Sequence, residues 1–153
     1  MDELPDWDDG TVAILSTGGG APHAIPVSTA VRSGPRTILL ALALRRESLA
    51  RLREDPRAAL TVLSRDVACT AHGVAVVAEE PLEESGRVAA IRLEVHEVQD
   101  HRQPRFAMHE GVRWSWIDEE ARIRDAEIRA ALRRVAIGTT RSVKPPSPRS
   151  SLR

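Results

Sequence analysis

Six strand-like segments joined mostly by short turns dominate the first two thirds of the sequence, and this pattern constrains the fold more than any other feature. The clearest segment alternates Ile91, Leu93 and Val95 with polar residues, which is the period of a half-buried strand. Only one short helix, ending at Asp55 and Pro56, interrupts the series. A doubly wound sheet would need a helix between successive strands, so we expect a mainly β (α+β), six-stranded antiparallel barrel. The segments are residues 11–17, 23–32, 37–44, 57–65, 67–78 and 91–96.

The last third of the sequence predicts a C-terminal helix followed by a tail. Asp118 is a suitable N-cap residue, and Gly138 is a suitable end. We expect the apolar stripe of this helix to pack on the barrel or on a partner subunit. Residues 139–153 are rich in Ser, Pro and Arg and predict a disordered tail after one folded domain, residues 1–138. The stripe consists of Ile117, Ala121, Ile128, Leu132 and Val135.

Composition and charge exclude several classes of protein. The 153 residues carry no net charge and include three Trp, one Phe and no Tyr, which is too few aromatic rings for a nucleic-acid stacking surface. A single cysteine, Cys69, excludes an internal disulfide and a cysteine-based zinc site, and its apolar setting predicts a buried thiol. The N-terminus is acidic, and no apolar stretch is long enough to cross a membrane. We therefore expect a cytoplasmic protein that contacts neither membrane nor nucleic acid.

Familiar catalytic and metal-binding motifs are absent from the sequence. The glycines at positions 18–20 lack the lysine and hydroxyl residue of a phosphate loop and precede a strand, so they predict a hairpin turn. There is no G-x-S-x-G motif for acyl transfer. His96 and His101 are five residues apart, which would place them on opposite faces of a strand. We therefore expect no metal site and identify no catalytic residue.

Two segments do suggest a ligand site. Ser48 is a plausible N-cap of the short helix, and Arg45 and Arg46 stand just before it; a helix start with two guanidinium groups suits a phosphate. The alternative is a turn with solvated arginines. The second strand has a face of small residues around Pro26, which cannot donate to a ladder and leaves room for a flat group. His72 and Gly73 lie in the middle of the fifth strand, where glycine suggests a bulge or the close approach of another backbone. Together these segments predict a cleft for a phosphorylated planar cofactor.

The sequence resembles the pyridoxamine 5′-phosphate oxidase-like family, whose members share an FMN-binding split β-barrel. The resemblance rests on AILSTGGGAPHAIPVS, LALALRRESLARLREDPRAALTV and TAHGVAVV, and it extends over residues 10–99. It implies a homodimer with the cofactor at the subunit interface. By resemblance, three groups of residues would bind FMN: Arg45, Arg46 and Ser48 at the phosphate, Pro26, Val27 and Ser28 along the ring, and Ala43 and His72 next to it.

The sequence departs from the family in two places. Many relatives have a lysine at Ser48 and an asparagine at Arg51, so the resemblance implies altered phosphate recognition. The C-terminal segment with which the true oxidase binds pyridoxal phosphate has no match, and Trp114, Ser115 and Trp116 stand there instead. We therefore do not expect vitamin B6 oxidation. Some actinobacterial relatives use a deazaflavin coenzyme, which is the alternative cofactor.

Two functions remain open from the sequence. The first is an oxidoreductase of the pyridoxamine-phosphate-oxidase-like family that transfers a hydride between FMN or a deazaflavin and a small substrate. The second is a non-catalytic split barrel that binds a deazaflavin, haem or other ligand, or has lost cofactor binding. Trp114 and Trp116 could cover the cofactor, although residues beside an amphipathic helix more often seal that helix to the barrel.

Overall fold

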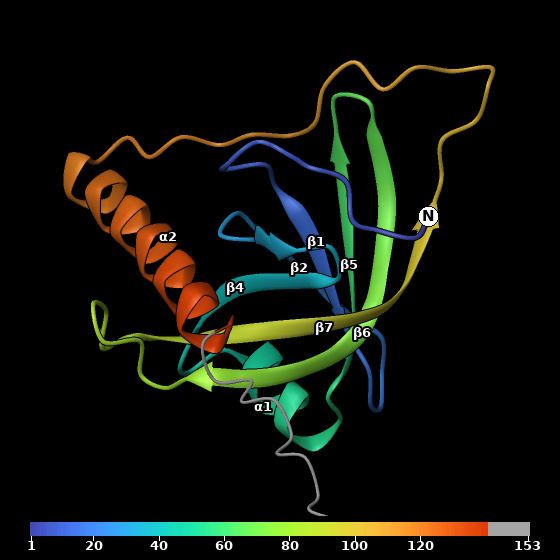
Figure 1. Ribbon diagram of the computed structural model, residues 1–153. Coiled ribbons are helices and arrows are strands. Elements are labelled where there is room, and N and C mark those ends of the chain that lie inside the picture. The colour runs from blue at the N-terminus through green and yellow to red at the C-terminus, as the bar shows by residue number, and fades with distance from the viewer. Residues whose placement is uncertain (141–153) are drawn as a thin grey trace, which may run out of the picture.

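A computed structural model describes residues 1–140, which form one antiparallel seven-stranded sheet and two helices (Figure 1). The order of the strands in the sheet is β2-β1-β5-β6-β7-β4-β3. The elements are β1 (Ala13–Thr17), β2 (His23–Val27), β3 (Val31–Gly34), β4 (Thr37–Ala43), α1 (Glu47–Glu54), β5 (Arg57–Ser64), β6 (Val67–Glu79), β7 (Val88–Asp100) and α2 (Glu119–Thr140).

The sheet curls into a barrel that stays open between its two edge strands, β2 and β3. These strands follow one another in the sequence, yet they lie at opposite ends of the strand order. The predicted strand over residues 23–32 is divided at residues 28–30, which is why the sheet has seven strands and not six. The hydroxyl of Thr29 accepts a hydrogen bond from the backbone N–H of Ala41 at 3.0 Å and lies 3.3 Å from its carbonyl oxygen. The predicted antiparallel split β-barrel is thus confirmed, and a side chain bridges the split.

The interior of the barrel is filled by the alternate, inward-facing residues of the strands. Leu15, Leu40, Leu60 and Ile91 are at most 1% exposed. Cys69 belongs to the same core, as its sequence setting predicts, and burial together with the charge of Asp100 raises the pKa of its thiol to about 11. A thiol held neutral in this way is chemically inert.

A bulge in β7 accompanies the glycine in the middle of β6. His72 pairs with Glu97 and Gly73 pairs with Val95, so His96 is the extra residue on β7. A side chain at Gly73 would overlap the backbone carbonyl of Glu94. The predicted close approach of another backbone at Gly73 is therefore present.

Helix α1 begins two residues earlier than its sequence suggests. Arg46 is the N-cap residue and makes no side-chain cap hydrogen bond, so the prediction that Ser48 caps the helix is wrong. Ser48 lies inside the first turn and is buried together with Leu49 and Leu52. Leu49 and Leu52 pack into the barrel core, which anchors the helix next to the end of β4.

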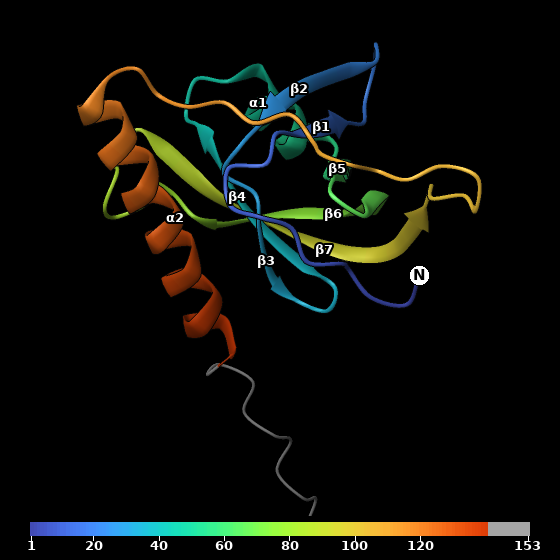
Figure 2. The same ribbon diagram turned by 90° about the horizontal axis from the view of Figure 1, so that it is seen from above.

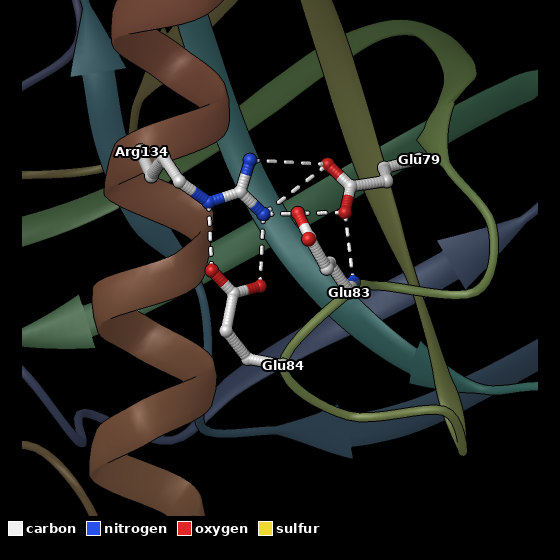
Figure 3. A network of polar contacts seen from close by, with 4 residues as sticks. All are labelled: Glu79, Glu83, Glu84 and Arg134. Atoms are coloured by element: carbon white, nitrogen blue, oxygen red, sulfur yellow. Dashed lines mark hydrogen bonds and ion pairs between the residues drawn. The ribbon is translucent and has the colours of Figure 1, made fainter.

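Helix α2 packs on the barrel beside β3 and β4, and the predicted apolar stripe explains why (Figures 1 and 2). Ile128, Leu132 and Val135 join a second core cluster, whereas Ile117 lies before the helix and is fully exposed. Near the other end of the helix, the guanidinium of Arg134 binds the carboxylates of Glu79 and Glu84 (Figure 3). Glu79 is the last residue of β6 and Glu84 lies in the β6–β7 connection, so the ion pairs tie α2 to this connection.

The predicted tail, residues 139–153, overlaps the end of α2 by two residues, and its remainder, residues 141–153, lies outside the described residues. Among the described helices, neither combines the length and apolar character needed to cross a membrane.

Candidate ligand cleft

A cleft of about 260 Å³ opens at the split in the barrel. One wall is made by the end of β2 and the residues that follow it, and the opposite wall by the end of β4. Helix α2 and the two tryptophans before it close a third side. The lining residues include Pro26, Val27, Ser28, Ala41, Ala43, Arg46, Trp114, Trp116, Arg124, Asp125 and Ile128.

Within residues 1–140, the two strands that border the cleft have a strand partner on one side alone at the cleft. Strand β2 pairs only with β1, because it is the edge strand of the sheet. Strand β4 pairs with β3 only as far as Leu39, so its last residues, up to Ala43, have a strand on one side alone. On β4, the N–H and carbonyl of Ala41 already bond to the hydroxyl of Thr29, and the carbonyl of Ala43 accepts from the backbone N–H of Arg46. A flat group placed here would therefore lie mainly against small side chains such as Pro26 and Ala43.

Two uncommitted arginines stand at one end of the cleft. Arg45 and Arg46 occupy the turn between β4 and α1, and both side chains are exposed. Arg46 lines the cleft. Within residues 1–140 neither guanidinium forms an ion pair or a side-chain hydrogen bond. The turn therefore has two free positive charges next to a helix N-terminus, which favours an anion.

Ser48, which by resemblance would bind the phosphate, points elsewhere. Its hydroxyl lies 3.0 Å from Nε2 of His23, and the residue is 1% exposed. Arg51 is also committed, because it binds Glu47 and donates to the carbonyl oxygens of Gly19 and Ala21. The serine and the arginine that replace the residues of many relatives therefore hold the β1–β2 turn and the start of β2 against α1.

His72 does not lie in this cleft. It lines a separate hollow of about 450 Å³ on the outer face of the sheet, together with Thr17 and His96. Nε2 of His72 and the hydroxyl of Thr17 are buried there without a hydrogen-bond partner. In the sheet, β6 is three strands away from β2, and His72 is not among the residues that line the cleft.

Helix α2 contributes a buried ion pair beside the cleft, which the sequence alone did not reveal. Asp125 and Arg129 approach to 2.5 Å, and their side chains are 10% and 17% exposed. Arg129 also lies 3.4 Å from the carbonyl oxygen of Ser28, to which it donates. The pair therefore links α2 to the corner between β2 and β3 and helps to hold that wall of the cleft.

The titratable groups with shifted pKa values lie outside the cleft. Each lowered carboxyl pKa has a nearby arginine as its main cause: Arg57 for Asp55, Arg102 for Asp100, Arg134 for Glu84, Arg51 for Glu47 and Arg122 for Glu119. None of these carboxyl groups lines the cleft. Within residues 1–140 there is also no cluster of three or more residues suited to a metal ion. Within the described residues, the pKa shifts therefore mark no candidate acid or base in the cleft.

Comparison with solved structures places this architecture in a known group. A candidate pyridoxamine 5′-phosphate oxidase from Lactobacillus delbrueckii is 14% identical, with a TM-score of 0.55 over 65% of this chain and 95% of that one. The flavin reductase component BorF of a bacterial two-component tryptophan halogenase is 15% identical, with a TM-score of 0.52 over 69% and 92%. HupZ of Group A Streptococcus is 12% identical, with a TM-score of 0.51 over 69% and 90%.

No protein-family model matches the sequence, and no curated protein sequence is similar to it. The matched region spans most of the length of each of these solved structures, but the sequence identity is low. The likeness therefore establishes the fold alone. The chain has the split β-barrel of pyridoxamine 5′-phosphate oxidase-like proteins, and the resemblance noted in its sequence is confirmed at that level.

Proposed function

We propose that the cleft binds FMN and that the chain is a flavin-dependent oxidoreductase acting on a small substrate. The observation that carries this proposal is the position of Arg45 and Arg46, whose side chains have no other partner within residues 1–140 and stand at one end of a cleft lined by small side chains. A phosphorylated planar ligand would place its phosphate at these arginines and its ring against the small side chains of the cleft. The flavin reductase among the similar structures supports the same choice of cofactor.

The residues present fit this group. The ring would lie along Pro26, Val27 and Ser28, next to Ala43, where the cleft is lined by small side chains and backbone. A volume of about 260 Å³ is slightly below the usual range for drug-sized ligands, about 300–1,000 Å³, so the cleft suits the ring and leaves the phosphate in the exposed turn at Arg45 and Arg46. When bound, FMN would supply the hydride chemistry, and the chain would position it and limit access of water.

We further propose a homodimer with the cofactor at the subunit interface. The outer face of the sheet supports this, because Ile14, Leu63 and Val74 point outward there and are 39–44% exposed. His72 shares that face. In a dimer built through this face, His72 could reach the cofactor only from the second subunit.

Titration of the purified protein with FMN, followed by flavin fluorescence, tests the cofactor, and light scattering tests the dimer. We expect saturable uptake of FMN by a dimer. A deazaflavin coenzyme is titrated in parallel, since the same cleft suits its ring. A protein that takes up neither compound would overturn the proposal, and a monomer at micromolar concentration would overturn the shared site.

The alternative is a split barrel that binds such a ligand without catalysis. It is favoured by one observation, that Ser48 and Arg51, at the two positions where the sequence departs from many relatives, are engaged with His23 and with the β1–β2 turn. The FMN-loaded protein distinguishes the two functions. Reduction of the bound flavin by a nicotinamide donor, at a rate above that of free FMN, supports the enzyme, and an unchanged rate supports the binding protein.

A further inference from the structure

We infer that Trp114 and Trp116 form an aromatic wall that stacks on a flat conjugated ring in the cleft. The inference deepens the proposed function, on which it rests for the identity of the ring. It concerns two residues whose role the sequence left open between covering the cofactor and packing. It predicts that ring stacking contributes to binding separately from the phosphate contacts at Arg45 and Arg46.

The exposure of the two indoles argues against a packing role. Trp114 and Trp116 are each 46% exposed, and neither belongs to a core cluster. Trp7 is the contrasting case, since it packs against the barrel core and its indole N–H donates to the carbonyl oxygen of Ala30 at 3.1 Å. Half-exposed tryptophans that line a cleft leave apolar ring surface available to a ligand.

The segment that carries the tryptophans is held at its two ends and free between them. Before it, the backbone N–H of Val12 donates to the carbonyl oxygen of Val112 at 2.9 Å, and Arg113 binds Asp8. After it, Asp118 accepts a hydrogen bond from the backbone N–H of Glu120 at the start of α2. An antiparallel bridge between Thr11 and Arg113 fixes the backbone at the start of the segment, but within residues 1–140 no side chain of residues 114–117 forms a hydrogen bond, so both indole N–H groups are left without a partner.

A second hollow is lined by the same two indoles. Trp114 and Trp116 line the cleft and also a hollow of about 200 Å³ next to Arg122 and Arg129. A segment that sealed α2 to the barrel would be packed, whereas these indoles border open space in two cavities.

The arrangement of the two indoles suits a planar ligand. Their ring centroids are 6.4 Å apart and their planes are inclined by 57°. One indole can stack face to face on a flat ring while the other meets its edge, which are the two favoured aromatic geometries. Pro26 and Ala43 line the same cleft and offer small surfaces to the other face of the ring. The ligand class is therefore a planar conjugated ring system.

The three tryptophans allow a direct test by NMR of their indole N–H groups. The probe is lumiflavin, which has the flavin ring without the phosphate-bearing chain. We expect lumiflavin to shift the signals of Trp114 and Trp116 and to leave that of Trp7 unchanged. Absence of a shift at both cleft tryptophans would overturn the inference without involving a variant that might misfold.

A variant with Trp114→Leu and Trp116→Leu measures the contribution of the wall. We expect lumiflavin binding to weaken about tenfold, the scale of one stacked aromatic ring. Phe106→Leu is the matched control, because Phe106 is a similarly exposed aromatic residue of the same connection and does not line the cleft. Equal affinity of the double variant and the wild-type protein would also overturn the inference.

The same titrations separate this inference from the proposed function. If FMN binds no more tightly than lumiflavin, the proposed phosphate contacts of Arg45 and Arg46 are refuted, whereas ring stacking by Trp114 and Trp116 is not affected. If FMN binds through Arg45 and Arg46 without shifting the indole N–H signal of Trp114 or Trp116, ring stacking is refuted and the proposed cofactor is retained.

Discussion

The hydroxyl of Ser48 lies 3.0 Å from Nε2 of His23, so the first turn of α1 is joined to the first residue of β2. This contact directs the serine away from the cleft and into a site where it is almost fully buried. The proposed phosphate contacts therefore involve Arg45 and Arg46 in the preceding turn and not Ser48. Four variants test this division of roles and the fold that supports it.

Ser48→Ala should lower the free energy of unfolding by about 1 kcal/mol, because it removes a hydrogen bond from a buried position. FMN affinity should change far less than in the arginine variants. Urea denaturation measures the stability, and a double-mutant cycle with His23→Ala isolates the contact. A large loss of FMN affinity without a loss of stability would show that the serine binds the phosphate after all.

Replacing Arg45 and Arg46 together with alanine should weaken FMN binding by about 3 kcal/mol, or roughly a hundredfold in Kd. The physical reason is the loss of charge-assisted hydrogen bonds from two side chains without other partners. Isothermal titration measures the change. Arg65→Ala, in the turn at the far end of β5, is the control and should bind FMN as the wild-type protein does. Equal affinity of the double variant and the control would place the phosphate elsewhere.

Gly73→Ala should destabilise the fold by about 1–3 kcal/mol, the usual cost of forcing an extra group into a packed site. The added methyl group would overlap the carbonyl oxygen of Glu94 across the β6–β7 pair. Gly86→Ala in the β6–β7 connection is the matched control, since nothing lies within 4 Å of the added group there. Thermal unfolding of the two variants gives the comparison, and equal melting temperatures would contradict the close approach.

Asp55→Asn should reduce stability at neutral pH, and its effect should disappear in acid. Hydrogen bonds from Arg57 lower the pKa of Asp55 from 3.8 to about 2, so the folded state favours the charged carboxylate. The stabilisation is complete above pH 4 and is lost as the pH falls toward 2. Urea titrations across this range measure it.

The control for this variant is Asp2→Asn, in the exposed N-terminal segment, whose stability should follow that of the wild-type protein at every pH. A difference between Asp55→Asn and the wild-type protein that stays constant down to pH 2 would contradict the role of the Arg57 contact.

Local patterns were sufficient to predict most of the secondary structure. Alternation in residues 91–96 marked a half-buried strand, and Asp55 with Pro56 marked the end of the short helix. The single helix between strands excluded a doubly wound sheet, and Gly73 indicated the close approach of a neighbouring backbone segment. These features depend on neighbours in the sequence and on the dihedral preferences of single residues, which do not require knowledge of distant segments.

The candidate site was predicted only in part. Pro26, Val27, Ser28, Ala43 and Arg46 do line one cleft, as the resemblance implies. Arg45 lies beside it in the same turn. Ser48 and His72 were assigned to the same site but lie elsewhere, because a serine at a helix start can point to either side and a strand can present a residue to either face.

The sequence by itself determined the strands, the short helix and the apolar face by which α2 packs on the barrel. The tertiary structure decided that the second strand divides at residues 28–30, that Ser48 meets His23, and that Trp114 and Trp116 face a cleft. The reason is the distance along the chain between the groups that meet. The cleft is formed by β2, β4 and α2, which local periodicity describes one at a time and only the closure of the barrel brings together.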